Sequence, residues 1–251
     1  MSVRITSVDK GSPADKARIK AGESLVSING NAIHDILDYQ FYASDKKLVI
    51  ELEDKTVKVR KGEYDDLGLN FETYLMDCKQ HCKNNCVFCF INQLPKGMRE
   101  TLYFKDDDSR LSFLQGNFVT LTNLTDDDVQ NVIQRNMSPM NVSVHAVSPD
   151  VRRRMMGRNA QRGMDVLETI MAAGIEIHAQ IVLCPGMNDG EELEKTLRFC
   201  EEHEQITSLG IVPLGFTKHQ NRFSWSYSDK PELARETIAM IRPFQDRAFE
   251  R

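Results

Sequence analysis

The sequence predicts an α/β protein with a small β-rich domain at residues 1–70 and a partial (β/α) barrel at residues 71–251, truncated at its C-terminal end. Alternating strand patterns and turn signals fill the first part. Strands and amphipathic helices alternate through the second part, in about five pairs. Such alternation predicts parallel strands joined by right-handed crossovers, and five pairs are too few for a closed eight-stranded barrel. A partial barrel or an open sheet remains.

The elements expected in the first domain are short. Residues 3–8 ("VRITSV") alternate like a half-buried strand, and "ESLVSI" predicts a second strand closed by the tight-turn pair Asn29-Gly30. A short helix is expected at residues 35–44, and "KLVIEL" with "TVKVRK" predicts a hairpin.

The second domain should contain longer elements. Its five strands are expected at residues 71–76, 117–122, 140–146, 176–183 and 208–215. Its helices are expected to open at a capping box at Thr125, to follow Ser148-Pro149, to end at Gly174, and to span residues 189–204 and 231–242.

Composition narrows the class of protein. The chain starts Met1-Ser2-Val3 without a charged and apolar leader, and its apolar runs are too short to span a bilayer. We therefore expect a cytoplasmic protein with no membrane association. Hydrophobic content of 41% and charged content of 27% are ordinary for a globular protein. The net charge of −5 does not indicate nucleic-acid binding, although a local basic patch stays possible.

Four of the six cysteines lie within residues 78–90, "CKQHCKNNCVFCF". In a reducing compartment such a cluster usually binds metal or does chemistry. Cys82, Cys86 and Cys89 are spaced CxxxCxxC after the first expected strand of the second domain, where α/β folds place ligands. Thiolates at this spacing select an iron–sulfur cluster or zinc.

A structural zinc site is the alternative reading of the same segment. It needs a fourth ligand, which Cys78 or His81 supplies. Zinc ribbons usually pair two separate knuckles, and no second knuckle follows downstream.

The stretch "GSPADKARIKAGESLVSINGNAI" resembles the PDZ pattern of bacterial proteases and scaffolds, over about residues 2–70. The resemblance implies that a peptide or protein C-terminus adds as a strand to the sheet edge, with backbone N–H groups holding its carboxylate. Gly68-Leu69-Asn70-Phe71 resembles the Gly-Leu-Gly-Phe carboxylate loop, placed late as in a permuted domain. The alternative is that these residues are only a linker.

CxxxCxxC with an aromatic residue, Phe88, before the last cysteine resembles the signature of radical S-adenosylmethionine (radical SAM) enzymes. Their fold is a partial (β/α)6 barrel. The resemblance implies a [4Fe–4S] cluster held by Cys82, Cys86 and Cys89, with one iron open to S-adenosylmethionine. Reductive cleavage of that cofactor would give a 5′-deoxyadenosyl radical, with the protein positioning the cofactor and excluding water.

Longer stretches extend the resemblance, among them "FCFINQLPKGMRETLYFKDDDSRLSFLQGNFVTLTNL", "VSVHAVSPDVRRRMM" and "IHAQIVLCPGMNDG". They are similar to a bacterial family of Fe–S oxidoreductases that joins a PDZ-like domain, a radical SAM core and a C-terminal domain of unknown function. This resemblance implies a sixth strand and a further domain beyond "IRPFQDRAFER", which leaves the barrel edge uncovered. It also implies an electron donor such as flavodoxin or ferredoxin.

Several polar residues are candidates for binding the cofactor. Thr122-Asn123 occupies the place where radical SAM enzymes often have a Gly-Gly-Glu turn that holds the methionyl amino group. Ser143, His145 and Gln180 alternate with apolar neighbours and are expected to point into the barrel, towards the nucleoside. For each of them the alternative is a satisfied polar residue of the core.

Charged side chains offer further candidates with simpler alternatives. One arginine of "VRRRMMGRNAQR" is a candidate for holding the methionyl carboxylate or an anionic substrate, and a solvated helix face is the simpler reading for most of Arg152, Arg153, Arg154, Arg158 and Arg162. In "KDDDSR", Asp107 and Asp108 either line the pocket mouth or cap a helix, and the cap is favoured.

Two further cysteines bear on the choice of function. Cys184, at the end of the fourth strand, is a candidate catalytic hydrogen donor or second thiol ligand, and otherwise a small buried hydrophobe. Cys78 as a fourth ligand would close the cluster. The first hypothesis is therefore a radical SAM enzyme whose PDZ-like domain docks a peptide or protein. The alternatives are a PDZ adaptor with a structural zinc and an electron-transfer protein with a fully ligated cluster.

Overall fold

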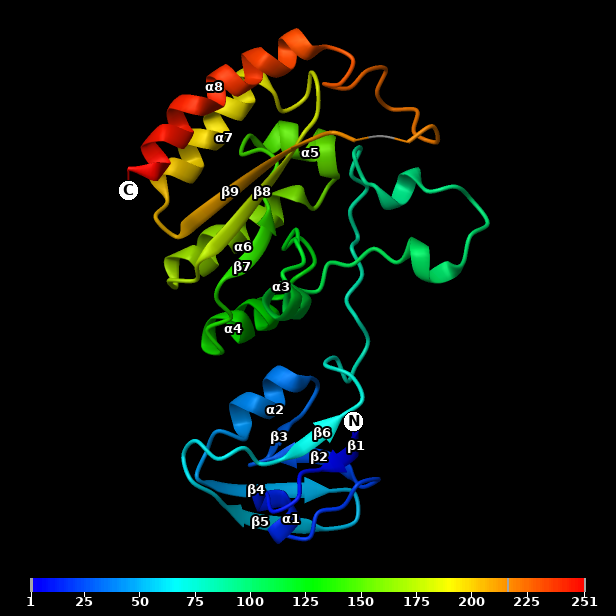
Figure 1. The fold of residues 1–251 in the computed structure, drawn as a ribbon, viewed down its shortest axis with the longest axis vertical. Coiled ribbons are helices and arrows are strands. Elements are labelled where there is room, and N and C mark those ends of the chain that lie inside the picture. Colours follow the sequence, from blue (N-terminus) through cyan, green and yellow to red (C-terminus); the bar gives the residue numbers. More distant parts are fainter. Residues whose placement is uncertain (1, 216, 251) are drawn as a thin grey trace. The chain divides into compact units, whose positions relative to one another are not determined.

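A computed structural model describes residues 2–215 and 217–250. The chain divides into two compact units, Met1–Lys79 and Gln80–Arg251. The first unit is built on an antiparallel sheet and the second on a parallel sheet flanked by helices, so the chain is a mixed α/β protein as predicted (Figure 1).

The N-terminal unit is a twisted antiparallel sheet with strand order β5-β4-β2-β1-β6 and a short β3 paired with β2. Its elements are β1 Val3–Val8, α1 Pro13–Lys16, β2 Ser24–Ile28, β3 Asn31–Ala32, α2 Ile36–Tyr42, β4 Lys47–Leu52, β5 Thr56–Arg60 and β6 Leu69–Phe71. The expected hairpin is confirmed, because β4 and β5 pair antiparallel in unbroken register. The expected helix at residues 35–44 is confirmed as α2, which Asp35 caps by accepting from the Asp38 N–H.

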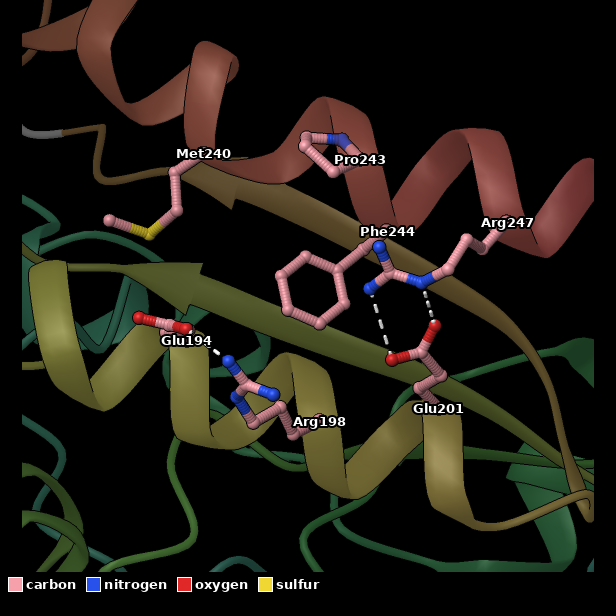
Figure 2. A pocket seen from close by; sticks show the side chains of 7 residues that line it. All are labelled: Glu194, Arg198, Glu201, Met240, Pro243, Phe244 and Arg247. Carbon is pink, nitrogen blue, oxygen red and sulfur yellow. Dashed lines mark hydrogen bonds and ion pairs between the residues drawn. The ribbon is translucent and has the colours of Figure 1, made fainter.

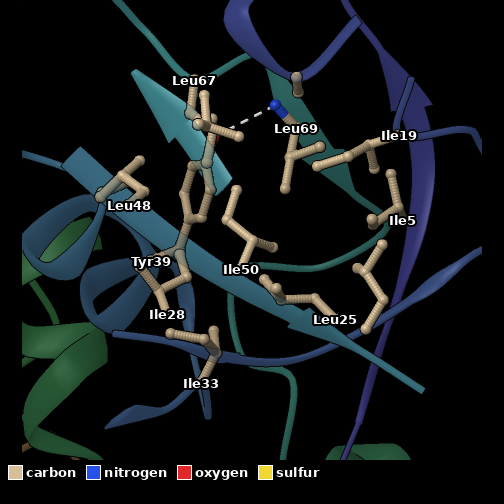
Figure 3. Close-up of a cluster of buried hydrophobic side chains, with 14 residues drawn as sticks. Ile5, Ile19, Leu25, Ile28, Ile33, Tyr39, Leu48, Ile50, Leu67 and Leu69 are labelled. Atoms are coloured by element: carbon tan, nitrogen blue, oxygen red, sulfur yellow. Dashed lines mark hydrogen bonds between the residues drawn. The ribbon is translucent and has the colours of Figure 1, made fainter. Parts of the chain in front are cut away.

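Alternation along the strands builds the core of this unit. In β4 the buried residues Leu48, Ile50 and Leu52 alternate with exposed ones, as a strand with one solvated face requires. They meet Ile5 and Leu25 from β1 and β2, both fully buried (Figure 3).

The strand expected at residues 71–76 is wrong. Only Leu69–Phe71 forms a strand, β6, and it pairs with β1 at the edge of the N-terminal sheet. The following residues turn back on α2: the Ile36 N–H donates to the Tyr74 carbonyl at 2.9 Å, and Leu75 bridges Asp35. The alternative that residues 69–71 are only a linker is therefore also wrong. The cysteine segment, residues 78–90, does not follow a strand of the parallel sheet.

Gly68, which precedes β6, is predicted to be intolerant of alanine. It has φ of +82°, and an added Cβ would lie 2.4 Å from Ser12 Cβ. Gly68→Ala should cost about 2 kcal/mol more than Gly30→Ala, because Gly30 has the same φ and open space around it. Amide exchange at Asp9, whose N–H donates to the Gly68 carbonyl, measures the difference. Equal protection in both variants would show that the contact with Ser12 is unimportant.

The C-terminal unit is a parallel sheet of order β7-β8-β9 with helices on its faces. Its elements are the 3₁₀ turns Ile91–Gln93 and Glu100–Tyr103, α3 Ser109–Gln115, α4 Asp126–Gln134, β7 Met140–Ser143, α5 Pro149–Met156, α6 Ala160–Ala172, β8 Ile177–Leu183, α7 Gly190–Glu202, β9 Ile206–Pro213 and α8 Pro231–Phe249. Within the described residues, no helix has the length and apolarity needed to cross a bilayer.

Local signals located the helices of this unit well. Thr125 and Asp128 form the expected capping box at α4, and Pro149 is the first residue of α5 after Ser148. The expected strand at residues 117–122 is wrong, since only Val119 bridges Val142. Leu121 has φ of +60°, and the Thr120 N–H donates to the Asp107 carboxylate instead of to a strand.

Helix α8 runs to Phe249, beyond the expected end near residue 242, and passes through Pro243. Contact with α7 supports this continuation. Phe244 packs in the cluster that contains Leu197 of α7, and the Arg247 guanidinium forks onto Glu201 at 2.5 and 3.1 Å (Figure 2). Packing and this ion pair therefore offset the hydrogen bond that proline removes from the helix.

Candidate metal centre

The cysteine segment is attached to the C-terminal unit through its backbone. The Asn85 and Val87 N–H groups donate to the carbonyls of Met156 and Met155 at 3.1 and 2.8 Å. These carbonyls belong to the last residues of α5 and would otherwise lack helical partners. The Cys82 N–H donates to the Lys105 carbonyl at 2.9 Å. Residues 82–87 are therefore held between α5 and the chain before α3.

Cys86 is the most buried thiol of CxxxCxxC. Cys86 is buried in a cluster that also contains Cys89 and Cys184. Burial, together with negative charge on Cys82 and Cys89, raises the pKa of the Cys86 thiol to about 12. Cys82 and Cys89 are therefore near enough to Cys86 for their charge to act on its thiol.

The helix cap favoured for Asp107 and Asp108 is confirmed for only one of them. Asp108 caps α3, as favoured, whereas the cap is wrong for Asp107, which is 1% exposed. Its carboxylate accepts from the Thr120 N–H and hydroxyl, each at 2.6 Å. Burial raises the pKa of Asp107, and burial followed by the charge of Asp107 raises that of Cys82 to about 11.

Thr122 and Asn123 lie against the cysteine segment. The Asn84 side-chain amide, from within CxxxCxxC, donates to the hydroxyls of Thr122 and Thr120 at 2.7 and 2.9 Å. The Asn123 amide donates to the His81 and Asp107 carbonyls. Its buried Oδ1 has no hydrogen-bond partner among the described residues. That oxygen can therefore accept a hydrogen bond from a bound molecule.

Ser143 and Gln180 are direct neighbours in the β7–β8 register, so their side chains share one face of the sheet. Val182, two residues after Gln180, is on the same face and packs in the Cys86 cluster. This is therefore the face that the cysteine segment covers.

His145 follows β7 and is buried, with φ of +61°. Its Nδ1 accepts from the Val182 N–H at 3.1 Å, which places the proton of the neutral ring on Nε2. The Phe88 ring lies against it, with centroids 4.5 Å apart. Burial lowers the pKa of His145 to about 3, and the charge of Arg152 acts in the same direction. The imidazole beside the cysteine segment is thus neutral.

The arginines between residues 152 and 162 differ in exposure and in partners. Arg153, Arg154 and Arg158 are exposed, whereas Arg162 pairs with Asp126 at 2.6 Å. Arg152 differs from all of these because it is 1% exposed, and its guanidinium donates to backbone carbonyls. The reading of Arg152 as part of a solvated face is wrong.

The two remaining cysteines of interest differ in exposure. Cys184 is fully buried after β8, its N–H donates to the Asn188 side chain at 2.7 Å, and burial followed by the charge of Cys86 raises its thiol pKa to about 12. Cys78 is exposed and belongs to the N-terminal unit.

Three thiols from one short segment are the donor set that an iron–sulfur cluster uses. Mutual repulsion of their thiolates in an apolar pocket is relieved when they share a cation, so the chemistry of the residues fits the cluster. Among the described residues, no three His, Cys, Asp or Glu side chains already form a metal-ligating group. The surface hollow between α7 and α8 is a different feature, lined by ion pairs and apolar side chains with no cysteine (Figure 2).

The edge of the N-terminal sheet carries the second candidate site. The Leu69 N–H, in the loop that resembles a carboxylate-binding loop, donates to the Tyr39 hydroxyl of α2 at 3.1 Å (Figure 3). The Asp66 carboxylate lies 3.5 Å from the same hydroxyl and accepts from the Gly68 N–H at 3.0 Å. The loop amides of Gly68 and Leu69 therefore have partners within the unit.

Comparison with known protein families agrees with this description of the two units. A family model described as a PDZ domain matches residues 4–54, which indicates peptide or protein binding. A search among curated proteins returned no match. A family model described as a Radical SAM-like domain matches residues 61–209, more than half of the chain. The chain therefore belongs to the Radical SAM-like domain family.

Proposed function

We propose that this protein is a radical SAM enzyme in which Cys82, Cys86 and Cys89 hold a [4Fe–4S] cluster. The observation that carries the proposal is the burial of Cys86 in an apolar cluster with Cys89, while Cys82 precedes Cys86 by four residues on the same segment. When bound, the cluster and S-adenosylmethionine supply reductive cleavage of the sulfonium and a carbon-centred radical.

The residues around the thiols would bind and shield the cofactor. The unpartnered Oδ1 of Asn123 suits a donor such as the methionyl amino group. Ser143 and Gln180 offer polar side chains on the sheet face that the cysteine segment covers, and His145 offers a neutral ring beside Phe88. Cys184 is the candidate hydrogen donor, since it shares the apolar cluster of Cys86. The parallel sheet would be part of a partial (β/α) barrel.

The PDZ-like unit would bring a peptide or protein to the enzyme, with a C-terminus as the proposed ligand end. A small electron-transfer protein of the flavodoxin or ferredoxin class would supply the electron.

Anaerobic reconstitution with iron and sulfide tests the enzyme proposal. Low-temperature EPR of the dithionite-reduced protein should show a [4Fe–4S] signal that changes when S-adenosylmethionine is added. An unchanged signal would favour a closed electron-transfer cluster. Uptake of zinc without iron would favour a structural zinc clip in a PDZ adaptor.

Single cysteine variants are predicted to behave unequally. Cys86→Ala should weaken cluster retention by more than about tenfold, because it removes a buried ligand, whereas Cys78→Ala should retain iron like the wild type. Iron and sulfide content per protein after desalting is the measurement. Equal loss from both substitutions would refute ligation by three cysteines.

A further inference from the structure

We infer that Arg152 is a positioning residue for the proposed cluster: its buried guanidinium supplies the fixed positive charge that compensates the thiolate centre at Cys86. The inference rests on the proposed function, because it assigns the charge to the cluster held there.

The guanidinium is locked in place by backbone carbonyls. Its Nε and Nη2 both donate to the Ala160 carbonyl, at 3.1 and 3.0 Å, and its Nη1 donates to the carbonyls of Ala146 and Val144. Gly163 leaves room for it, since an added Cβ there would lie 3.2 Å from Nη2. Arg152 thus ties α5 to the chain after β7 and to the start of α6, and its donors are engaged by the fold itself.

The helix that Arg152 fixes also holds the cysteine segment. Met155 and Met156 follow Arg152 within one turn of α5, and their carbonyls accept the N–H groups on either side of Cys86. Ala146 and Ala160, which accept from Arg152, pack in the same apolar cluster as Cys86. The position of Cys86 therefore depends on the residues that Arg152 binds.

Among the described residues, the hydrogen-bond acceptors of the Arg152 guanidinium are backbone carbonyls and include no carboxylate. Carbonyl groups solvate a guanidinium but carry no net charge, and a buried cation without a counter-ion is costly. Burial lowers the pKa of Arg152 to about 10, and negative charge at Cys86, followed by that at exposed Asp165, acts against this effect. Thiolates that hold a cluster at Cys86 would carry the opposite charge, and such a cluster becomes more negative on reduction. A nearby fixed cation stabilises that reduced form.

Arg152→Gln and Arg152→Lys separate charge from structure. Both lose the planar fork, so both should lower the urea midpoint of the apo-protein, which the emission of Trp225, the single tryptophan, reports. Only Arg152→Gln should lower the midpoint potential of the reconstituted cluster in an EPR-monitored dithionite titration. The expected change is at least tenfold in the reduction equilibrium, about 59 mV for one electron. Arg154→Gln, exposed on the same helix, should leave the potential unchanged.

Nuclear magnetic resonance of the wild-type protein gives a test that does not depend on whether a variant folds. The Nε–H signal of Arg152 should broaden beyond detection in the cluster-loaded protein, while that of Arg154 stays visible. A sharp Arg152 signal in the cluster-loaded protein would overturn the inference. Equal midpoint potentials in the wild type and both Arg152 variants would also overturn it. So would an equal fall of the midpoint potential in Arg152→Gln and Arg152→Lys. If the wild type takes up no iron, the proposed function fails and this inference with it. Iron uptake with an unshifted potential overturns this inference alone.

Discussion

Gly163→Ala should destabilise the C-terminal unit by about 2 kcal/mol or more, although the same change in an open helix is stabilising by about 1 kcal/mol. An added Cβ at Gly163 would lie 2.5 Å from the Thr120 carbonyl oxygen and 3.0 Å from Thr122 Cγ2. The nearer atom is backbone, so it cannot turn aside as a flexible side chain would. Helix α6 must therefore move away from residues 120–122.

The displaced residues are the ones that hold Asn84 within CxxxCxxC, so iron loading of Gly163→Ala should fall together with stability. Urea unfolding followed by Trp225 emission measures the stability of this unit. Glu168→Ala, exposed on the same helix, is the matched control and should change stability by less than about 0.5 kcal/mol. A Gly163→Ala protein as stable as the control would show that α6 does not need the close approach.

The free energy of unfolding is expected to depend strongly on pH through His145. Its pKa is lowered from 6.5 to about 3, chiefly by burial, so between these values the unfolded chain binds a proton that the folded protein does not. Acid then favours unfolding: this contribution is complete above about pH 6.5 and is lost as the pH falls towards 3. From pH 6.5 to about pH 4.5 the loss should reach about 2 kcal/mol.

His145→Asn removes this titration while keeping a residue that tolerates the left-handed backbone at φ of +61°. The difference between variant and wild type, measured by urea unfolding of the apo-protein across that range, cancels other titrating groups such as Asp107. The wild type should lose more stability in acid than His145→Asn. Parallel curves would mean that the imidazole is protonated in the folded protein.

The elements that the sequence located correctly are those specified by local chemistry. The capping box at Thr125 and the proline at position 149 start helices through hydrogen bonds and backbone angles within a few residues. The two wrong strands depended on distant partners. Leu75 pairs with Asp35, and Thr120 is captured by Asp107, and neither choice is visible in an alternating pattern.

The candidate site shows the same division. Spacing alone identified Cys82, Cys86 and Cys89 as a group, because ligands on one short loop must lie close together. Asp107 was obscured by its acidic neighbours, since a run of three aspartates does not reveal which one is buried. Arg152 did leave a signal: it precedes Met155 and Met156 by three and four residues, which is the spacing of the buried face of α5. Its charge concealed that pattern.

The Tyr39 hydroxyl already accepts the hydrogen bond of the Leu69 amide, so it competes with any ligand for that amide. Any peptide carboxylate that uses this amide must first displace the hydroxyl, and it approaches a loop that already holds the Asp66 carboxylate. The measured dissociation constant then equals the intrinsic one divided by the fraction of molecules in which the amide is free. Such an internal competition weakens the binding of any carboxylate at this amide.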